Sequence, residues 1–312
     1  MPSRRRFLQN ILVAGATPVA LSTTGSLAWA ALFPTDAAND YPLKYPRVNR
    51  PGIALGAYDP SGNFKDYPGV SIEHVFMPWQ DVDLSSLLSA DHYARERRRQ
   101  LLITIEPWSW SEDSHPTADQ LRDAMLAGHH DERIRSIARV VAQLKSPVTL
   151  RWGQEMEEAN NPFPWSGWKP TDYIAAYRRF HDISSPIALT AKFMWSPKGN
   201  ANLADYYPGD AYADSIGLSI FGYQKYDRTV FGAERQFADV LGLCYQYTSL
   251  FGKEIVVAEC GYAGDPTYVG HWAHAITKKD PRFPLLSAVV YFDDVESTPW
   301  PGSGDLPDWR VG

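Results

Sequence analysis

The sequence predicts a single α/β domain of the (β/α)8 barrel type, also called the TIM barrel. From Pro51 onward, short apolar runs alternate with segments of helical pattern, which is typical of βα units and a parallel sheet. The apolar runs lack strict polar/apolar alternation, as expected for strands that helices cover. Eight such runs within about 260 residues match this barrel in size and in strand number.

Each expected element has its own apolar or helical segment, in chain order. The predicted strands are 53–58, 71–77, 101–106, 148–155, 188–195, 215–222, 254–259 and 288–293. The predicted helices are 84–99, 117–144, 171–183, 230–251 and 268–277, with a shorter and less regular segment at 203–212. A doubly wound open sheet is the alternative, but no Gly-x-Gly-x-x-Gly turn follows the first strand. No stretch between Pro51 and Asp294 has the composition of a linker, which favours one domain.

The first 30 residues have the features of a twin-arginine export signal. Adjacent arginines at 4–6 precede an apolar stretch at 11–21, and small residues at 28–30 surround a cleavage point. The stretch is too short to span a bilayer as a permanent helix. We therefore expect residues 1–30 to be cleaved and the mature protein to be periplasmic or secreted. A retained basic anchor is the alternative.

The mature chain would then consist of an extended lead-in at 31–50 and a barrel domain at 51–312. Removing three arginines and no acidic residue would change the formal charge from −6 to −9. A chain this acidic is not suited to binding nucleic acid or an anionic membrane surface, so we expect neither partner. We expect a monomer.

No metal or cofactor site is predicted from the sequence. The two cysteines, Cys244 and Cys260, have no His or Cys neighbours at metal-ligand spacing. A disulfide between them is possible but not favoured, since a protein that folds before export does not need one.

Two glutamates stand where predicted strands end. Glu155 closes the fourth strand and Glu259 the seventh, 104 positions later. The active sites of such barrels lie at the carboxyl ends of the strands, and strands four and seven face each other there. Paired carboxylates are the working groups of glycoside hydrolysis. Other acids compete for these roles, with Glu106 first because it also ends a strand; the rest are Glu157, Glu158, Asp293 and Asp294.

Tryptophans also gather at the predicted strand ends and loops. Seven of the eleven share this placement: Trp79, Trp108, Trp110, Trp165, Trp168, Trp195 and Trp300. Indole faces stack on the C–H faces of sugar rings, so the cluster indicates a carbohydrate substrate. Core packing is the alternative for any single ring, and it is favoured for Trp152 inside a strand.

Several segments together resemble glycoside hydrolase family 26. Arg151-Trp-Gly-Gln-Glu-Met156, with Trp165 downstream, is similar to that family's Arg-x-x-His-Glu-Met segment on strand four. Three further segments resemble its strand three, the approach to strand six and the strand-seven nucleophile segment: 105–108, 207–217 and 257–261. The resemblance runs from about residue 50 to residue 295.

The resemblance implies a (β/α)8 barrel that cleaves β-linked glycans internally with retention, notably mannans and some β-glucans. By position, Glu155 would be the acid/base and Glu259 the nucleophile. An aromatic hydroxyl after strand six would support the nucleophile; Phe221 or Tyr223 holds that place, and only Tyr223 has the hydroxyl. The candidate substrate-binding residues are Arg151, Gln154, Glu106, Trp108, Trp110, Trp165, Trp195, Tyr223 and Tyr291.

One departure from that family bears on the substrate. The family's mannanases have a histidine before the acid/base, whereas this chain has Gln154. An amide there suits an equatorial sugar 2-hydroxyl, so we expect a β-glucan (β-1,4 or mixed-linkage) rather than mannan. An endo-β-1,4-mannanase remains an alternative, as does a carbohydrate-binding or polysaccharide-assembly protein whose chemistry has decayed. A metal-dependent hydrolase would need ligands from His74, His115, His129 and His130, which lack ligand spacing.

Overall fold

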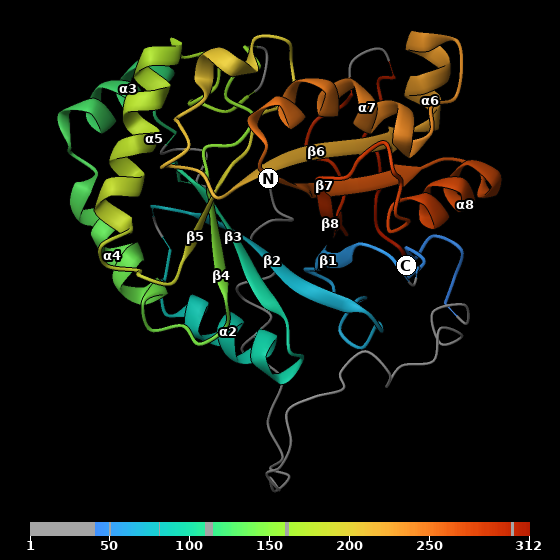
Figure 1. The fold of residues 1–312 in the computed structure, drawn as a ribbon, viewed down its shortest axis with the longest axis horizontal. Coiled ribbons are helices and arrows are strands. Elements are labelled where there is room, and N and C mark those ends of the chain that lie inside the picture. Colours follow the sequence, from blue (N-terminus) through green and yellow to red (C-terminus); the bar gives the residue numbers. More distant parts are fainter. Residues whose placement is uncertain (1–40, 50, 81, 110–114, 160–161, 301–302) are drawn as a thin grey trace, which may run out of the picture.

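The chain folds into one closed barrel of eight parallel strands. The computed structural model describes residues 41–49, 51–80, 82–109, 115–159, 162–300 and 303–312. The strands follow one another around the barrel in sequence order, and the eighth pairs with the first (Figure 1). The predicted fold class is confirmed.

All eight predicted strands are present, with shifted ends. They are β1 Ala54–Tyr58, β2 Val70–Pro78, β3 Gln100–Glu106, β4 Val148–Trp152, β5 Lys192–Trp195, β6 Ser215–Tyr223, β7 Glu254–Ala263 and β8 Leu286–Phe292. The prediction was wrong at three ends. β4 stops three residues before Glu155, β5 begins at Lys192 because residues 188–191 complete the turn after a helix, and β7 runs on to Ala263.

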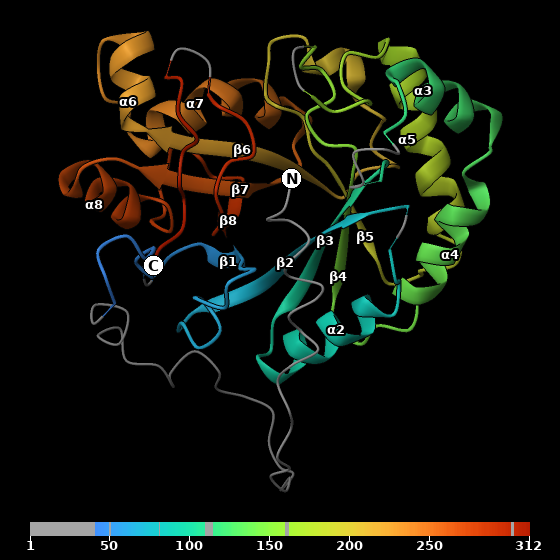
Figure 2. The same cartoon turned by 180° about the vertical axis from the view of Figure 1, so that it is seen from behind.

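Helices cover the outside of the barrel. The α-helices are α2 Ser86–Glu96, α3 Ala118–Ala127, α4 Asp131–Val141, α5 Pro170–Ser184, α6 Gln224–Tyr226, α7 Phe237–Thr248 and α8 Pro266–Ala275. Short 3-10 turns lie at η5 Leu203–Tyr206 and η7 Ser249–Phe251, and a π turn, η6, at Asp227–Phe231. Helices α3, α4 and α5 flank β3 to β5, while α7 and α8 lie beside β6 and β7 (Figures 1 and 2).

The segment 117–144 is two helices rather than the single one predicted. Thr117 and Gln120 form a capping box that starts α3. Gly128 then ends it at φ 81°, a left-handed conformation that glycine adopts without strain. The chain restarts as α4 and turns its apolar face, including Ile134 and Ile137, onto the barrel.

The barrel interior is apolar at one end and polar at the other. A small apolar cluster fills the half of the interior nearer the amino ends of the strands: Leu102, Met194, Val256, Ala258, Ala288 and Val290. Alternate residues of a strand share a face, so Thr104 and Glu106 follow Leu102 inward toward the carboxyl end of β3. Ile103 and Ile105 face the helices instead. The polar groups therefore collect where the loops meet.

A bulge in β7 changes which side chains face inward. Leu218 of β6 pairs with Val257, but Ser219 pairs with Glu259, which leaves Ala258 as an extra residue. A bulge of this kind shifts the alternation of side chains by one position. Ala258 lies in the interior cluster, and Glu259 also reaches the interior, where it contacts Arg151 of β4.

Residues 41–49 and the C-terminal segment close the outer surface. The predicted extended lead-in at 31–50 is a packed part of the body over 41–49, since Tyr45 is buried and the N–H of Arg47 donates to Ala273 O. At the other end, the N–H of Val311 donates to Asp293 Oδ1. Residues 1–40, which include the predicted export signal, lie outside the described residues.

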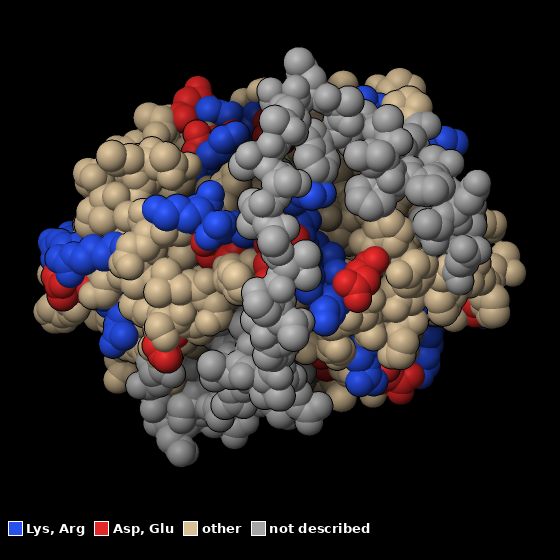
Figure 3. Space-filling model, turned by 90° about the horizontal axis from the view of Figure 1, so that it is seen from below, with Lys and Arg blue, Asp and Glu red and all other residues tan. Residues whose placement is uncertain are grey.

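Three further findings concern membrane-spanning helices, the cysteine thiols and the distribution of surface charge. No helix among the described residues is long and apolar enough to cross a membrane. Cys244 and Cys260 are both free thiols. On the face shown in Figure 3, Lys and Arg side chains lie among Asp and Glu rather than in a separate patch.

Candidate active site

Glu155 sits on a tight turn just beyond β4. It has φ 58°, an uncommon conformation for a non-glycine residue, and Gly153 has φ 57°. The turn is fixed at both sides: the N–H of Glu155 donates to Ser196 O at 2.8 Å, and Ser166 Oγ donates to Glu155 O at 3.1 Å. Strain held by surrounding contacts is typical of functional sites. Glu155, predicted to close the fourth strand, therefore stands on a turn beyond it.

Glu259 lies across the barrel and is bound by a buried arginine. Arg151 Nη1 donates to Glu259 Oε1 at 2.7 Å, and the Arg151 side chain is fully buried. The guanidinium is itself fixed by Ser196 Oγ at 2.8 Å and Thr104 Oγ1 at 3.3 Å. A guanidinium binds a carboxylate in its ionised form. The structure therefore brings Arg151 and Glu259, both predicted, into direct contact.

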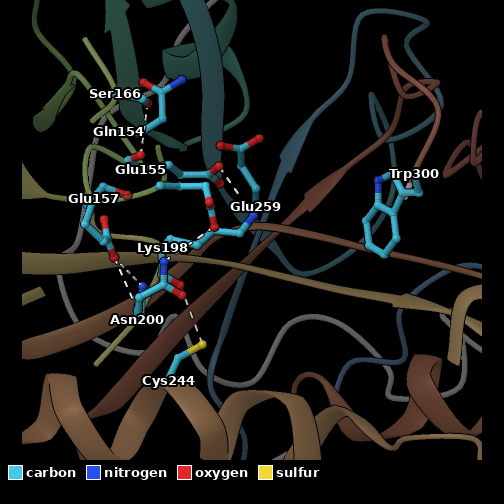
Figure 4. Close-up of polar contacts among 12 residues, drawn as sticks. Gln154, Glu155, Glu157, Ser166, Lys198, Asn200, Cys244, Glu259 and Trp300 are labelled. Carbon is cyan, nitrogen blue, oxygen red and sulfur yellow. Dashed lines mark hydrogen bonds and ion pairs between the residues drawn. The ribbon is translucent and has the colours of Figure 1, made fainter. Parts of the chain in front are cut away.

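A lysine that the sequence reasoning did not single out contacts Glu155. Lys198 Nζ lies 3.4 Å from Glu155 Oε2. Burial raises the pKa of Glu155, but Lys198, the Ser219 hydroxyl and Arg151 outweigh that effect, so the pKa lies below its usual value. Burial lowers the pKa of Lys198, and the charges of Glu155 and Glu259 raise it above its usual value. Figure 4 shows Glu155, Lys198 and Glu259 gathered at one place.

Glu106 positions its neighbours from a fully buried site. Its Oε1 accepts from Gln154 Nε2 at 3.1 Å, and its Oε2 accepts from Trp108 Nε1 at 3.1 Å. Because a carboxylate can only accept, these contacts orient the Gln154 amide with Oε1 turned away from Glu106. That oxygen is buried and has no hydrogen-bond partner among the described residues. Its capacity to accept a hydrogen bond is therefore unused within the described part of the chain.

The other competing carboxylates have structural contacts. Glu157 Oε1 accepts from the N–H groups of Gly199 and Asn200, and burial raises its pKa despite them. Asp293 accepts from Asn63 and Val311. Within the described residues, no group of three or more His, Cys, Asp or Glu is arranged to hold a metal ion. His74 lies inside the barrel, 2.8 Å from Thr104 Oγ1.

Most of the predicted tryptophan rim belongs to the core. Trp79, Trp165 and Trp195 are fully buried, and Trp108 is 2% exposed. Their rings pack against other aromatic side chains, as in the 4.6 Å stack of Trp165 with Phe163. Burial therefore supports core packing rather than sugar stacking for these rings. Trp110 lies outside the described residues.

Two predicted substrate-binding tyrosines are directed elsewhere. The Tyr223 hydroxyl donates to Asp305 at 3.3 Å and not to Glu259, contrary to the expectation that it supports that carboxylate. The Tyr291 hydroxyl is buried and donates to Trp309 O at 2.6 Å. Tyr291 thus ties β8 to the C-terminal segment. Trp300, half-buried, stands apart from the two glutamates in Figure 4 and packs beside Tyr223.

Sequence reasoning missed Lys198 and Ser196, which follow β5. The strand-end search stopped at Trp195, an apolar residue, and did not follow the chain into the next loop. The signal available was their place: barrel sites are built from the loops that follow the strands as well as from the strand ends. Ser196 holds both Arg151 and the backbone of Glu155, so this loop connects the two halves of the site.

Sequence comparisons with known proteins give short matches. No family model matches the chain. A beta-1,3-xylanase of an Alcaligenes species is 25% identical over 104 residues, which are 31% of this chain and 21% of that protein. The chain thus matches about a fifth of the length of that relative.

Solved structures match over most of the chain. A modular endo-beta-1,4-mannanase from Cellulomonas fimi, described with family 26 mannanases, has TM-score 0.61 and 16% identity over 81% of this chain and 68% of its own. GH26C from Muricauda sp. MAR_2010_75 has TM-score 0.57 and 13% identity over 84% and 83%. A broad specificity endoglucanase from an uncultured bacterium has TM-score 0.54 and 11% identity over 73% and 76%. The chain therefore shares the closed (β/α)8 fold of these three proteins.

Proposed function

We propose that the protein is a glycoside hydrolase, a retaining endo-β-glycanase. The observation that carries the proposal is the placement of Glu155 and Glu259 after β4 and within β7, each beside its own cation at the polar end of the barrel. Retaining glycosidases need two such carboxyl groups on either side of the scissile bond. The similarity in fold to a mannanase and an endoglucanase supports the same class of substrate.

The two environments suggest a division of roles. Glu259, fixed by the buried Arg151, suits the nucleophile, which stays ionised and attacks the anomeric carbon. Glu155, beside a more exposed and flexible lysine, suits the acid/base. It would protonate the leaving oxygen as the glycosidic C–O bond breaks. As a carboxylate it would then take a proton from the water that releases the sugar from Glu259.

We propose that the sugar carries an equatorial 2-hydroxyl. The unpaired Gln154 Oε1 is an acceptor for such a group, and Glu106 holds its amide in place. Glucosyl and xylosyl units have an equatorial 2-hydroxyl, whereas mannosyl units have an axial one. This favours a β-glucan, β-1,4 or mixed-linkage, and the xylanase match adds xylan to the substrates worth testing. Mannan is the alternative.

A polysaccharide panel tests the function. The purified protein should release new reducing ends from β-glucan or xylan faster than from mannan. Glu155→Gln and Glu259→Gln should each lower the rate by about a thousandfold or more. Glu132→Gln, an exposed change in α4, is the matched control and should leave the rate unchanged.

Two outcomes would contradict parts of the proposal. Preference for mannan would reject the assignment of the 2-hydroxyl. Binding of a glycan without release of reducing ends, in the wild type as in both variants, would instead support a carbohydrate-binding protein with decayed chemistry.

We further propose export by the twin-arginine route, on the arginines at 4–6 and the apolar stretch after them. Replacing Arg5 and Arg6 with lysine should retain the protein inside the cell, and fractionation with an antibody would detect this. Unchanged export would contradict the proposal.

A further inference from the structure

The backbone around Lys198 is fixed on both sides. Gly199, at φ 103°, lies against Cys244 so closely that a Cβ there would be 2.6 Å from Cys244 Cβ. Cys244 Sγ lies 3.6 Å from Lys198 O, and Glu157 accepts the N–H of Gly199 at 2.8 Å. Helix α7 and the β4 loop together therefore hold the start of this side chain next to the site.

Among the charged groups that face Glu155, Lys198 is the one whose side chain is free to move. From β4, Arg151 is fully buried and bound to Glu259, Ser196 and Thr104. From β6 comes the uncharged Ser219 hydroxyl. From β7 comes the Glu259 carboxylate, whose charge also acts on Lys198. The Lys198 side chain is 39% exposed and has a flexible stem. It can respond to a ligand where Arg151 cannot.

We propose that Lys198 is a positioning residue that governs when the Glu155 carboxyl carries a proton, an inference that rests on the proposed function of the site. In the free protein the ammonium favours the Glu155 carboxylate. That form is the base needed to release the sugar, but it cannot act as the acid that opens the glycosidic bond. Lys198 therefore restricts cleavage to acidic pH, where Glu155 still holds its proton.

The test compares Lys198→Met with two controls. Lys198→Arg keeps the charge, and Lys192→Met removes an exposed lysine at the opposite end of β5. The alkaline limb of the pH profile of kcat/KM reports the essential acid of the free enzyme. Losing an attractive charge lets Glu155 keep its proton to higher pH, so the limb should move up by about 1 pH unit in Lys198→Met. Both controls should retain the wild-type limb.

A second readout does not require activity. With 13C-labelled glutamate, the Glu155 carboxyl signal is identified by its loss in Glu155→Gln, and its titration midpoint is followed by NMR. The midpoint should rise in Lys198→Met and not in Lys192→Met. An unchanged midpoint in folded Lys198→Met would overturn the inference. A raised midpoint in a protein that cleaves no glycan would support the role of Lys198 and contradict the proposed function.

Discussion

At the residue scale, the site rests on two carboxylates that differ in their partners. Glu259 has a rigid partner, since Arg151 is buried and tied to two hydroxyls as well. The partner of Glu155 is the flexible side chain of Lys198. Glu155 itself lies on a backbone turn and has positive φ. This difference suits a reaction in which one carboxyl group stays ionised and the other gains and loses a proton.

Removing Arg151 should destabilise the protein as well as stop hydrolysis. Arg151→Met leaves Glu259 buried without its guanidinium, a change that costs about 3–5 kcal/mol for buried ion pairs. Urea unfolding at neutral pH measures the free energy of unfolding. Arg139→Met, which breaks the exposed pair with Glu132, is the control and should change it by less than about 0.5 kcal/mol. Equal effects of the two changes would contradict the account of Arg151.

Sequence reasoning placed the charged residues better than the aromatic ones. Glu155, Glu259, Arg151 and Gln154 lie at the polar end of the barrel, where they were expected, because a strand end fixes where a side chain emerges. The tryptophans were misjudged, since residue type and position do not tell whether a large ring is covered by neighbours. Tyr223 was misassigned because the direction of its hydroxyl depends on Asp305, far along the chain.

At the element scale, irregular features rather than regular ones position the site. The bulge at Ala258 brings Glu259 to the barrel interior, and the loop after β5 carries Ser196 and Lys198. Neither has a clear signal in apolar periodicity, which predicts where strands lie but not where their pairing shifts. The break at Gly128 shows the same limit for helices.

Substitution of Gly199, in the loop after β5, should destabilise the protein. Gly199→Ala adds a methyl group against Cys244 and places alanine at φ 103°. We expect the free energy of unfolding to fall by about 2 kcal/mol or more, from backbone strain and crowding together. Gly252→Ala, also at positive φ but with open space around the added atom, isolates the strain and should cost about 1 kcal/mol. Chemical denaturation compares the two variants. A loss for Gly199→Ala no larger than that for Gly252→Ala would show that the contact with Cys244 does not matter.

At the scale of the whole molecule, a second pair of carboxyl groups lies where the first and the last strand of the barrel meet. Asp59 follows β1 and accepts the N–H groups of Asn63 and Phe64. Asp293 follows β8 and accepts from Asn63 Nδ2 and the N–H of Val311. Burial, together with the charge of Asp59, raises the pKa of Asp293 to about 7.

This pair predicts that the protein loses stability as the pH rises toward neutrality. Between about pH 4 and pH 7 the folded protein keeps a proton on Asp293 that the unfolded chain has released. The free energy of unfolding should therefore fall across that interval, by on the order of 3 kcal/mol from this group. Asp293→Asn keeps a hydrogen-bond donor without titrating and should remove this part of the pH dependence. The exposed Asp66→Asn should not; equal pH dependence in both would contradict the prediction.

The barrel itself was predictable because eight apolar runs in a regular order allow few other folds. The packing of 41–49 and of the C-terminal segment against the body was not, since it depends on contacts such as Arg47 with Ala273 and Val311 with Asp293. These contacts join parts of the chain that are far apart in sequence.

The central claim is that Glu259 attacks the sugar and Glu155 supplies the proton. Azide rescue tests it most directly, with an activated aryl β-glycoside of the oligosaccharide that the wild type cleaves. Azide takes the place of the missing carboxylate, so Glu259→Ala should yield the α-glycosyl azide and Glu155→Ala the β-glycosyl azide, which NMR distinguishes. The opposite pairing of variants and products, or no azide product from either, would contradict the account.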